Sequence, residues 1–345
     1  MLAQMKVAEL STPALVVDGS MLARNLDTMA AARPGDRLRP HVKAHKCTSL
    51  AREQAARGHA HFTCATPNEV VGLARAGLGA DVLLANACVD RERLQTMARC
   101  DGRVTVAIDS DETLAAAAAS GIRHVLVDVN VGMPRCGCAP DDAARLAGRA
   151  RDAGLDVRGV MGYEGHVVGE VDAAKRAEQT EVAMAILARA HAAVGGDLIS
   201  AGGTGTYACN TYATEIQAGS YALMDGSYAQ LGLPFGRALA LVGTVLHVAP
   251  AYAVADCGLK AQSMDHGNPA IDDADVWFCS DEHVTYAPRR VPRVGDRVFV
   301  WPAHVDPTVA MHTRLHVADG SGLDATIVDT WPVDLRGWDV DAARR

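Results

Sequence analysis

The stretch VTVAIDSDETLAAAAASGIRHVLVDV, residues 104–129, decides the fold class. Val104–Ile108 and Val125–Val129 are short apolar runs rich in β-branched residues, a composition typical of buried strands. Between them, Asp111–Ser120 is rich in alanine, the strongest helix former. Because a helical segment joins two short apolar strands, the stretch predicts a β–α–β unit with parallel strands.

The alternation of strands with helices extends from about residue 13 to residue 232. Strands are expected at 14–17, 38–42, 61–64, 81–84, 104–108, 125–129, 157–161 and 198–200, with residues 215–224 completing the series. Helices are expected at 20–32, with Ser20 as N-cap, and at 49–57, 68–76, 91–99, 111–120, 141–153 and 173–194. About eight such units predict an α/β fold, a (β/α)8 TIM barrel. A doubly wound sheet would carry a glycine fingerprint after its first strand, and Asp18-Gly-Ser20 does not supply one.

After residue 237 the pattern changes to short apolar runs separated by Pro, Gly and Asp turns. Strands are expected at 240–248, 252–256, 276–279, 297–301 and 325–328, and helical periodicity is nearly absent. This segment predicts a small C-terminal β domain of about 110 residues.

The composition narrows the class of protein. The chain has 345 residues and a formal net charge of −8, and its Lys and Arg residues form no cluster, which argues against nucleic-acid and anionic-membrane partners. Nine cysteines are scattered without a CxxC pair, and residues 1–6 are not followed by the apolar core of a signal peptide. The longest apolar runs, such as Leu239–Tyr252, are too short and broken to span a membrane. We expect a soluble, cytoplasmic protein with reduced thiols.

A short segment with one arginine, two lysines and two histidines lies at the end of the second expected strand, Arg39-Pro-His-Val-Lys43-Ala-His-Lys46. At the C-terminal mouth of a barrel, where barrel enzymes place their chemistry, Lys43 would be a nucleophile toward an aldehyde. Partial burial and neighbouring cations activate such a lysine, and the candidate cations are Arg39, His41, His45 and Lys46. A basic strand end without catalytic function is the alternative.

A glycine-rich loop, Gly202-Gly-Thr-Gly-Thr206, follows the short apolar strand at 198–200. Barrels bind phosphate at their last two βα loops, where glycines such as Gly205 let backbone N–H groups approach the anion. Thr204 or Thr206 would add a hydroxyl donor, and Gly219-Ser220 would be the second half of the cradle. Most glycine-rich loops are only turns, so the loop alone does not establish a phosphate site.

The segment His304-Val-Asp306 carries an imidazole and a carboxylate two residues apart. In an extended segment, residues i and i+2 project to the same side, so both side chains would reach one ion. An imidazole and a carboxylate with open coordination positions suit a divalent cation that contacts substrate oxygen. A surface loop beside Pro307 without metal is the alternative. Residues that could support the metal ligands without binding the metal are His312, His316, Glu282 and His283.

Several segments, in order across nearly the whole chain, are together more specific than any single motif. They are Thr12–Asp18, Arg39–Lys46, Met161–His166, Ser200–Thr206, Gln217–Asp225, Asp256–Ser263 and Pro302–Thr308. With them the chain resembles the alanine-racemase-like, fold-type III pyridoxal 5'-phosphate (PLP) enzymes, and specifically their D-threonine aldolase and D-serine dehydratase branch. The resemblance implies a PLP-binding barrel over residues 10–235, a β-rich domain over residues 1–9 plus 236–345 that carries the metal site, and a homodimer.

The resemblance also implies a role for individual residues. Lys43 would be the Schiff-base lysine, Arg135 would face the phenolic oxygen of PLP, and Tyr163 would pack on the ring face. The residues implied at the phosphate are Thr204, Gly205, Thr206, Gly219 and Ser220, with Tyr228 a weaker candidate. Gln217 occupies the place where alanine racemase has an arginine opposite the pyridine nitrogen. A neutral amide there would leave the protonation of the ring open, and an ordinary strand-end residue is the alternative.

For His304 and Asp306 the resemblance implies metal binding. Some members carry cysteine in place of Asp306, and the hard carboxylate favours Mn²⁺ or Mg²⁺ without excluding Zn²⁺. Because the aldolases of the branch tend to carry Asp and its dehydratases Cys, Asp306 favours aldol cleavage of a D-3-hydroxy amino acid, D-threonine or a similar one, to glycine and an aldehyde. His166, in the same loop as Tyr163, is the candidate base.

Three other activities stay open. A dehydratase would use a base such as Lys43 to remove the α-proton, with metal-assisted loss of the hydroxyl, to give an oxo acid and ammonia. A metal-free racemase would require a catalytic tyrosine in the C-terminal domain and would have no metal-binding pair. A non-catalytic PLP-binding regulator would lack the C-terminal domain. D-Threonine, D-phenylserine-like compounds and 3-hydroxy-D-aspartate are all candidate substrates.

Overall fold

The computed structural model describes residues 5–340. Two ranges lie outside the described residues. They are residues 1–4, part of the stretch 1–6 that was compared with a signal peptide, and residues 341–345, part of the expected β-rich domain. The described chain forms two compact units. The β-rich unit comprises residues 5–28, 44–49 and 220–334, and the barrel unit comprises residues 29–43, 50–219 and 335–340.

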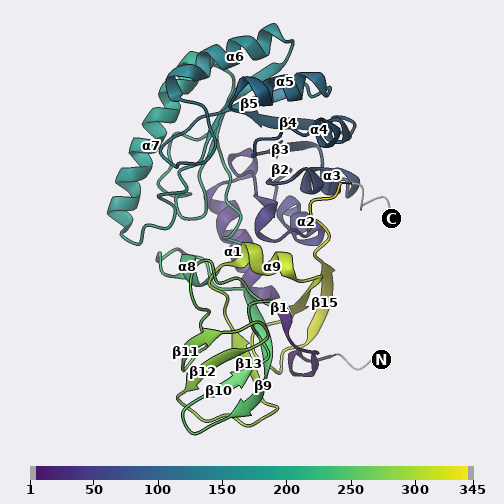
Figure 1. Cartoon of the computed structure of the whole chain (residues 1–345), viewed down its shortest axis with the longest axis vertical. Helices are drawn as coiled ribbons and strands as arrows, with labels where there is room; N and C mark the ends of the chain where they lie inside the picture. The colour runs from purple at the N-terminus through teal and green to yellow at the C-terminus, as the bar shows by residue number, and fades with distance from the viewer. Residues whose placement is uncertain (1–4, 341–345) are drawn as a thin grey trace. The chain divides into compact units, whose positions relative to one another are not determined.

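The barrel unit is built on a parallel sheet of seven strands that pair in sequence order, β2 to β8. The first four of them, β2 to β5, are labelled in Figure 1. Its central strands are buried along almost their whole length, as expected for parallel strands with both faces covered. Six of the predicted strands are thereby confirmed within one residue at each end, and the segment expected at 215–224 is a strand only over its first two residues. The bounds are β2 (His61–Cys64), β3 (Asp81–Leu84), β4 (Arg103–Ile108), β5 (His124–Asp128), β6 (Asp156–Gly162), β7 (Leu198–Ala201) and β8 (Glu215–Ile216).

Residues 38–41 connect the two edges of this sheet. Leu38 forms a parallel bridge with Ile216 of β8, and His41 forms a parallel bridge with Thr63 of β2. The segment therefore takes the place of the eighth barrel strand, and the predicted (β/α)8 architecture is confirmed.

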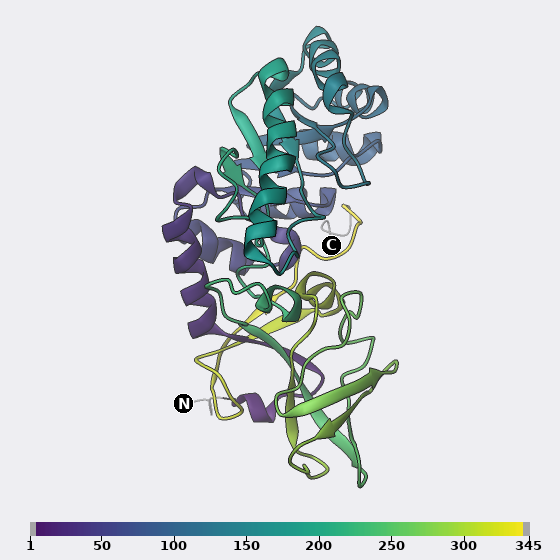
Figure 2. The same cartoon turned by 90° about the vertical axis from the view of Figure 1, so that its left-hand side faces the viewer.

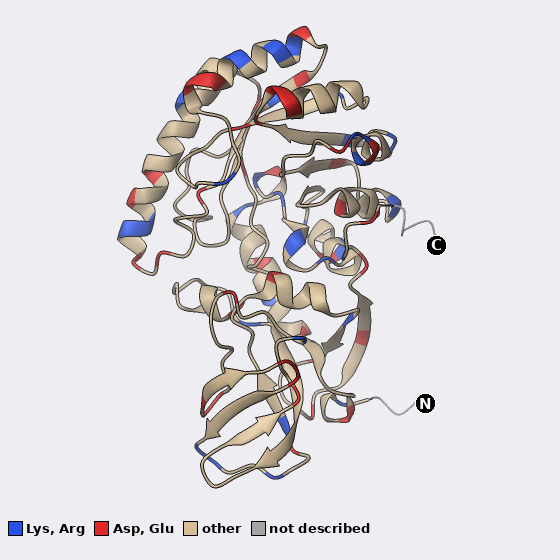
Figure 3. Ribbon diagram, in the orientation of Figure 1, with Lys and Arg blue, Asp and Glu red and all other residues tan. Residues whose placement is uncertain are grey.

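Helices follow the barrel strands, and side-chain caps fix where several of them begin. Thr66, Asp90 and Ser110 each accept a backbone N–H from the first turn of the helix that follows. The longest helix, α7, faces the viewer in Figure 2, and Figure 3 shows both basic and acidic residues on it. The bounds are α1 (Gly19–Ala32), α2 (Thr48–Ala56), α3 (Pro67–Arg75), α4 (Arg91–Ala98), α5 (Asp111–Ala119), α6 (Ala143–Asp152) and α7 (Ala173–Val194).

The interior of the barrel holds a network of ion pairs. Arg39, which is 1% exposed, donates to Glu215 over 2.7 Å and to Asp81 over 3.1 Å. Arg158 donates to both oxygens of Asp81 over 3.0 and 2.9 Å. Burial alone would raise the pKa of Asp81, but the charges of Arg39 and Arg158 hold it below its usual value. These charges compensate one another inside the core, as buried charges must.

The strand predicted at 14–17 belongs to the other unit, which corrects the expectation that it begins the barrel. It is β1 (Ala14–Asp18), which pairs antiparallel with β9 (Leu239–Val248) and parallel with β14 (Arg314–Ala318). A second correction concerns the start of α1, because Asp18 rather than Ser20 accepts the backbone N–H of Met21 over 3.0 Å. A short apolar run has the same hydrophobic pattern in either sheet, so the pattern does not identify its partner strand.

The β-rich unit contains a mixed sheet in the order β11-β12-β10-β9-β1-β14-β15, and β13 also pairs with β9. The elements β12, β14, α8 and α9 of this unit were not expected from the sequence. The remaining bounds are β10 (Ala253–Ala255), β11 (Ala274–Cys279), β12 (Val284–Pro288), β13 (Arg297–Val300), β15 (Ile327–Pro332), α8 (Gly226–Ala229) and α9 (Val305–Met311). Within residues 5–340, every helix is too short or too polar to traverse a lipid bilayer.

Candidate active site

Lys43 lies in a short 3-10 turn, Val42–Ala44, directly after the segment that joins β8 to β2. It is partly buried, and its backbone N–H faces Nδ1 of the buried His41 over 3.5 Å. Arg39, one of the cations expected beside Lys43, instead directs its guanidinium to Glu215 and Asp81 in the barrel interior. The end of this segment thus presents a half-buried lysine next to a buried histidine.

The loop after β7 is organised by the buried carboxylate of Glu164. This carboxylate accepts the backbone N–H of Gly202 over 3.2 Å, the hydroxyl of Thr206 over 2.7 Å and the side-chain amide of Asn210 over 3.4 Å. The backbone N–H of Thr206 donates to the Gly203 carbonyl. Both hydrogen-bond donors of Thr206 therefore have acceptors within the protein. Its hydroxyl, which was expected to bind a phosphate, donates to Glu164 instead.

Glycine is required at the tightest point of this loop. A Cβ added to Gly205 would lie 1.8 Å from the carbonyl oxygen of Val168, a distance that no side chain tolerates. A Cβ added to Gly203 would lie 3.6 Å from the ring of Tyr163, so the loop passes beside that ring. The loop and Tyr163 are therefore neighbours in the barrel unit.

Tyr163 also contacts the candidate arginine. The guanidinium of Arg135 lies over the Tyr163 ring at 5.3 Å from its centroid, a cation–π arrangement. Both residues line a small cavity with Asp128, which ends β5. Burial and the nearby charge of Asp109 raise the pKa of Asp128 to about 7, although Arg135 opposes the rise. His166, the candidate base, is exposed, and its imidazole packs against Gly132.

Gln217 follows β8 and binds a strand neighbour. Its amide nitrogen donates to the hydroxyl of Ser200 over 2.8 Å, and that hydroxyl donates to Glu215 over 2.6 Å. The chain of hydrogen bonds orients the amide, which is partly exposed and carries no charge.

The second candidate centre lies at the start of α9, in the β-rich unit. His304 is the extended N-cap of this helix, and Asp306 lies in its first turn. This corrects the expectation that both residues share one extended segment, because the helix begins at Val305 and includes Asp306 and Pro307 in its first turn. Asp306 is 9% exposed, and the hydroxyl of Ser220 donates to its Oδ1 over 3.3 Å.

Asp225 places a second carboxylate near Asp306. It accepts the backbone N–H of Val305 over 3.0 Å and that of Tyr228 over 2.9 Å, which caps α8. Burial raises the pKa of Asp225, and the charge of Asp306 raises it further while His304 lowers it. Both carboxylates are buried, but among the described residues neither Asp225 nor Asp306 belongs to the group of potential ligands whose atoms lie within 4.8 Å of one another.

Sequence reasoning missed the residues that surround His304. Nδ1 of His304 and Oδ2 of Asp265 are 2.7 Å apart, and the ring of His266 stacks on that of His304 at 3.9 Å. Potential ligand atoms of these three residues lie within 4.8 Å of one another. The supporting groups expected from the sequence bind elsewhere: His312 to the Ala261 carbonyl, His316 to Thr330 and Glu282 to Lys260.

The residues present fit the two groups that the resemblance implies. The glycine loop beside Tyr163 can receive a phosphate at its backbone while a ring packs on the tyrosine. The nitrogen and oxygen donors of His304 and Asp306 are those that manganese, magnesium and zinc accept.

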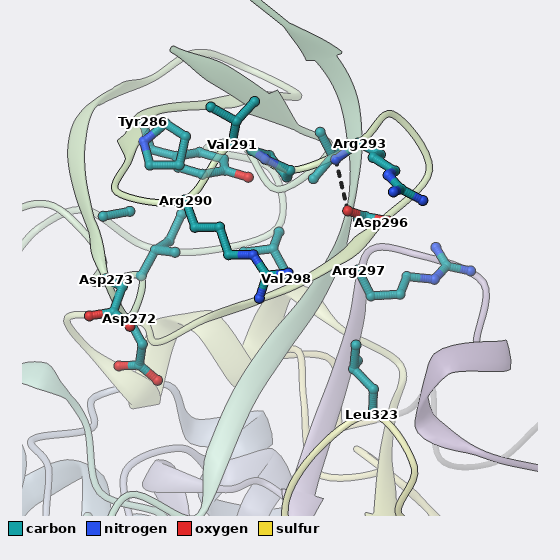
Figure 4. Close-up of a pocket in the computed structure, with 15 residues that line it drawn as sticks. Asp272, Asp273, Tyr286, Arg290, Val291, Arg293, Asp296, Arg297, Val298 and Leu323 are labelled. Atoms are coloured by element: carbon teal, nitrogen blue, oxygen red, sulfur yellow. Dashed lines mark hydrogen bonds between the residues drawn. The ribbon is translucent and has the colours of Figure 1, made fainter. Parts of the chain in front are cut away.

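A larger cavity lies elsewhere in the β-rich unit. It has a volume of about 690 Å³ and is lined by Tyr286, Arg290, Arg293 and Val298, among others (Figure 4). None of the candidate residues lines it, and its lining carries both cationic and acidic side chains. Size alone therefore does not identify the reaction site.

A barrel with a lysine at a strand end, a glycine cradle beside an aromatic ring and a separate imidazole–carboxylate pair defines a cofactor-dependent barrel enzyme. The sequence matches the family described as alanine racemase, N-terminal domain, over residues 17–226, and the putative serine dehydratase domain over residues 238–318. The chain belongs to the alanine-racemase-like PLP enzymes, in the branch that holds the D-threonine aldolases.

Individual relatives cover nearly the whole chain. It is 32% identical to the D-threonine aldolase of an Arthrobacter species, over 96% of this chain and 94% of the relative. It is 30% identical to the 3-hydroxy-D-aspartate aldolase of Paracoccus denitrificans, with the same coverage. The crystal structure of D-threonine aldolase from Filomicrobium marinum is similar with a TM-score of 0.91, at 31% identity over 97% of both chains. Aldolases of this kind are carbon–carbon lyases.

Proposed function

We propose that this protein is a PLP- and divalent-metal-dependent aldolase that cleaves D-3-hydroxy amino acids of the D-threonine type to glycine and an aldehyde. The observation that carries the proposal is the pair His304 and Asp306, held at the start of α9 with the carboxylate buried. A buried carboxylate at this position favours a hard cation that binds oxygen, which suits a substrate with a β-hydroxyl. The names of the relatives point to the same substrate class.

The barrel unit would hold the cofactor. Lys43 would anchor PLP covalently through its amine, and the backbone of Thr204, Gly205 and Gly219 would receive the phosphate. Arg135 and Tyr163, already in contact, would flank the ring, and the uncharged Gln217 would face its nitrogen. When bound, PLP supplies the electron sink at Cα and the cation acts as a Lewis acid on the hydroxyl.

His304 and Asp306 would hold the cation. Mn²⁺ is the first choice because the donor set combines one imidazole with a carboxylate, while Mg²⁺ and Zn²⁺ are the alternatives. With only two protein ligands assigned, coordination positions remain for water and substrate.

His166 is the proposed base. It is exposed, in the loop after β6 that also carries Tyr163. His166 would accept the proton of the β-hydroxyl while the electrons of the Cα–Cβ bond move to Cα and the former hydroxyl carbon becomes an aldehyde. A proton delivered to Cα then completes glycine.

A dehydratase is the second candidate, because residues 238–318 match the putative serine dehydratase domain. That reaction removes the α-proton and expels the β-hydroxyl, and it gives an oxo acid and ammonia. The same residues would serve both reactions, so the distinction lies in which bond breaks.

The test compares wild type with Lys43→Ala after loading with PLP and Mn²⁺. Wild type is expected to show the visible absorption band of a PLP–lysine Schiff base and to release acetaldehyde from D-threonine, and chelation of the metal is expected to abolish the release. Lys43→Ala should lose the band and the activity, whereas Lys175→Ala, the matched control at a residue 57% exposed on α7, should keep both. A band that persists in Lys43→Ala refutes the anchor, and activity that survives chelation favours a metal-independent reaction.

A further inference from the structure

We infer that Asp265 is a positioning residue for the metal centre: it holds His304 in the tautomer that carries its proton on Nδ1, so that Nε2 is the metal-binding atom. The inference rests on the proposed function, because it assumes that His304 binds a cation. It adds a residue that none of the sequence motifs indicated and assigns the ligand atom of the histidine.

The contact between the two side chains is short and direct. Nδ1 of His304 and Oδ2 of Asp265 lie 2.7 Å apart, the length of a charge-assisted hydrogen bond. A carboxylate is an acceptor only, so the imidazole must be the donor. The proton therefore lies on Nδ1, and the lone pair of Nε2 is left for a ligand.

The carboxylate itself is fixed by a closed ring of hydrogen bonds. The hydroxyl of Ser263 donates to Oδ1 of Asp265 over 2.5 Å, and the backbone N–H of Ser263 donates to the hydroxyl of Thr308 over 3.1 Å. Thr308 in turn donates to the backbone carbonyl of His304 over 2.7 Å. Ser263 and Thr308 are buried, so the ring connects Asp265 to the backbone of the residue that it orients.

A second contact fixes the plane of the His304 ring. His266 stacks on it with a centroid distance of 3.9 Å and an angle of 2° between the planes. The hydroxyl of Ser227 lies 3.2 Å from Nδ1 of His266 and donates to the Ala303 carbonyl over 2.9 Å. Stacking limits tilt of the imidazole, and Asp265 limits its rotation within the plane.

This arrangement matches the general behaviour of metal-binding histidines. The ring nitrogen that is not on the metal donates to a carboxylate or carbonyl, which fixes the tautomer and makes the ligand nitrogen more basic. Removing such a partner weakens metal binding by about 10- to 100-fold in other proteins. Without Asp265, His304 would divide between two tautomers and several ring orientations, and only a fraction would be ready to bind.

The test measures Mn²⁺ binding directly, by titration of the PLP-loaded protein followed by calorimetry or by the electron paramagnetic resonance of free Mn²⁺. Asp265→Ala is expected to weaken binding about 10- to 100-fold. Asp265→Asn keeps an acceptor for the Nδ1 proton and should recover most of the loss. Asp281→Ala is the matched control, because Asp281 is 76% exposed and its removal takes the same charge from the same unit.

The outcomes separate the inference from the proposed function. Wild type that binds no Mn²⁺, Mg²⁺ or Zn²⁺ overturns both. Wild type that binds while Asp265→Ala binds equally well overturns the positioning role alone. Asp265→Asn that loses as much affinity as Asp265→Ala also overturns it, because that result would make Asp265 a metal ligand in its own right. An unchanged PLP absorption spectrum and melting temperature show that each variant is folded.

Discussion

The hydroxyl of Ser220 donates a hydrogen bond to Oδ1 of Asp306 over 3.3 Å. Ser220 directly follows Gly219, the glycine assigned to the second half of the phosphate cradle. Ser220 is thus adjacent in sequence to the expected phosphate site and hydrogen-bonded to the expected metal ligand. Because its hydroxyl donates to the carboxylate, only its backbone N–H would contact a phosphate.

We expect Ser220→Ala to affect the metal more than the cofactor. The variant removes a hydrogen bond to a buried carboxylate, a contact worth about 1 kcal/mol, so Mn²⁺ affinity should change by about five-fold. The affinity for PLP should change little, because the backbone at Ser220 is retained. Parallel titrations with Mn²⁺ and PLP check this, and a large loss of PLP affinity with unchanged Mn²⁺ binding would show that the hydroxyl serves the phosphate.

Glu164→Gln should disorganise the glycine loop. The Glu164 carboxylate accepts from Gly202, Thr206 and Asn210, and an amide would turn an N–H group toward one of these donors. We expect a loss of about 1–3 kcal/mol in stability and weaker PLP binding, measured by denaturant unfolding and PLP titration. Glu178→Gln, on the exposed side of α7, is the control and should be neutral. Equal behaviour of the two variants would contradict the role given to Glu164.

Two glycine substitutions should have opposite effects. In Gly205→Ala the new Cβ would lie 1.8 Å from the Val168 carbonyl, so the loop must move and PLP binding should fall sharply. Gly148, inside α6, has nothing within 4 Å of its added Cβ. Gly148→Ala should therefore stabilise the protein by about 0.5–1 kcal/mol, because alanine favours the helix. Thermal melting and PLP titration check both, and normal PLP affinity in Gly205→Ala would show that the loop does not form the cradle.

Asp128 should make the stability of the cofactor-free protein depend on pH. Burial and Asp109 raise the pKa of Asp128 from 3.8 to about 7, so the folded state must keep a proton that the unfolded chain has already lost between these values. Below about pH 4 the carboxyl therefore does not lower the free energy of unfolding. As the pH rises it lowers this free energy increasingly, by at most about 4 kcal/mol near pH 7 and above.

The comparison of Asp128→Asn with wild type isolates this cost. The variant should melt at the same temperature as wild type below about pH 4 and at a higher one above about pH 7. Asp152→Asn, at the exposed end of α6, serves as control and should show no such divergence. A stabilisation that is independent of pH would indicate that the Asp128 carboxyl is already neutral or solvated.

The barrel could be predicted from the sequence because each strand is a local signal. Val104–Ile108 and Val125–Val129 are mostly apolar and buried, and one capped helix, α5, separates them. The partner of Ala14–Val17 is not a local property, and the run was assigned to the wrong sheet. The helix α9 was missed because it has seven residues and follows an extended histidine, too short for a helical period to show.

Candidate site residues could be proposed from the sequence only where they form contiguous motifs. Lys43, the loop at 202–206 and His304 with Asp306 are candidates of this kind, and their roles stay predictions. Asp265 was not, because it lies 39 residues from His304 and only the fold brings the two together. Glu164 and Asp128 were likewise not singled out, since a carboxylate at a strand end looks the same in sequence whether it is solvated or buried.

The measurement that tests the central claim most directly is proton NMR of D-threonine turnover in deuterium oxide by the protein loaded with PLP and Mn²⁺. Cleavage of the Cα–Cβ bond predicts acetaldehyde and glycine in equal amounts, with solvent deuterium at Cα of the glycine. Formation of 2-oxobutanoate and ammonia with deuterium at C3, and no glycine, would contradict the account, because it would show that the β-hydroxyl leaves and the carbon–carbon bond stays intact.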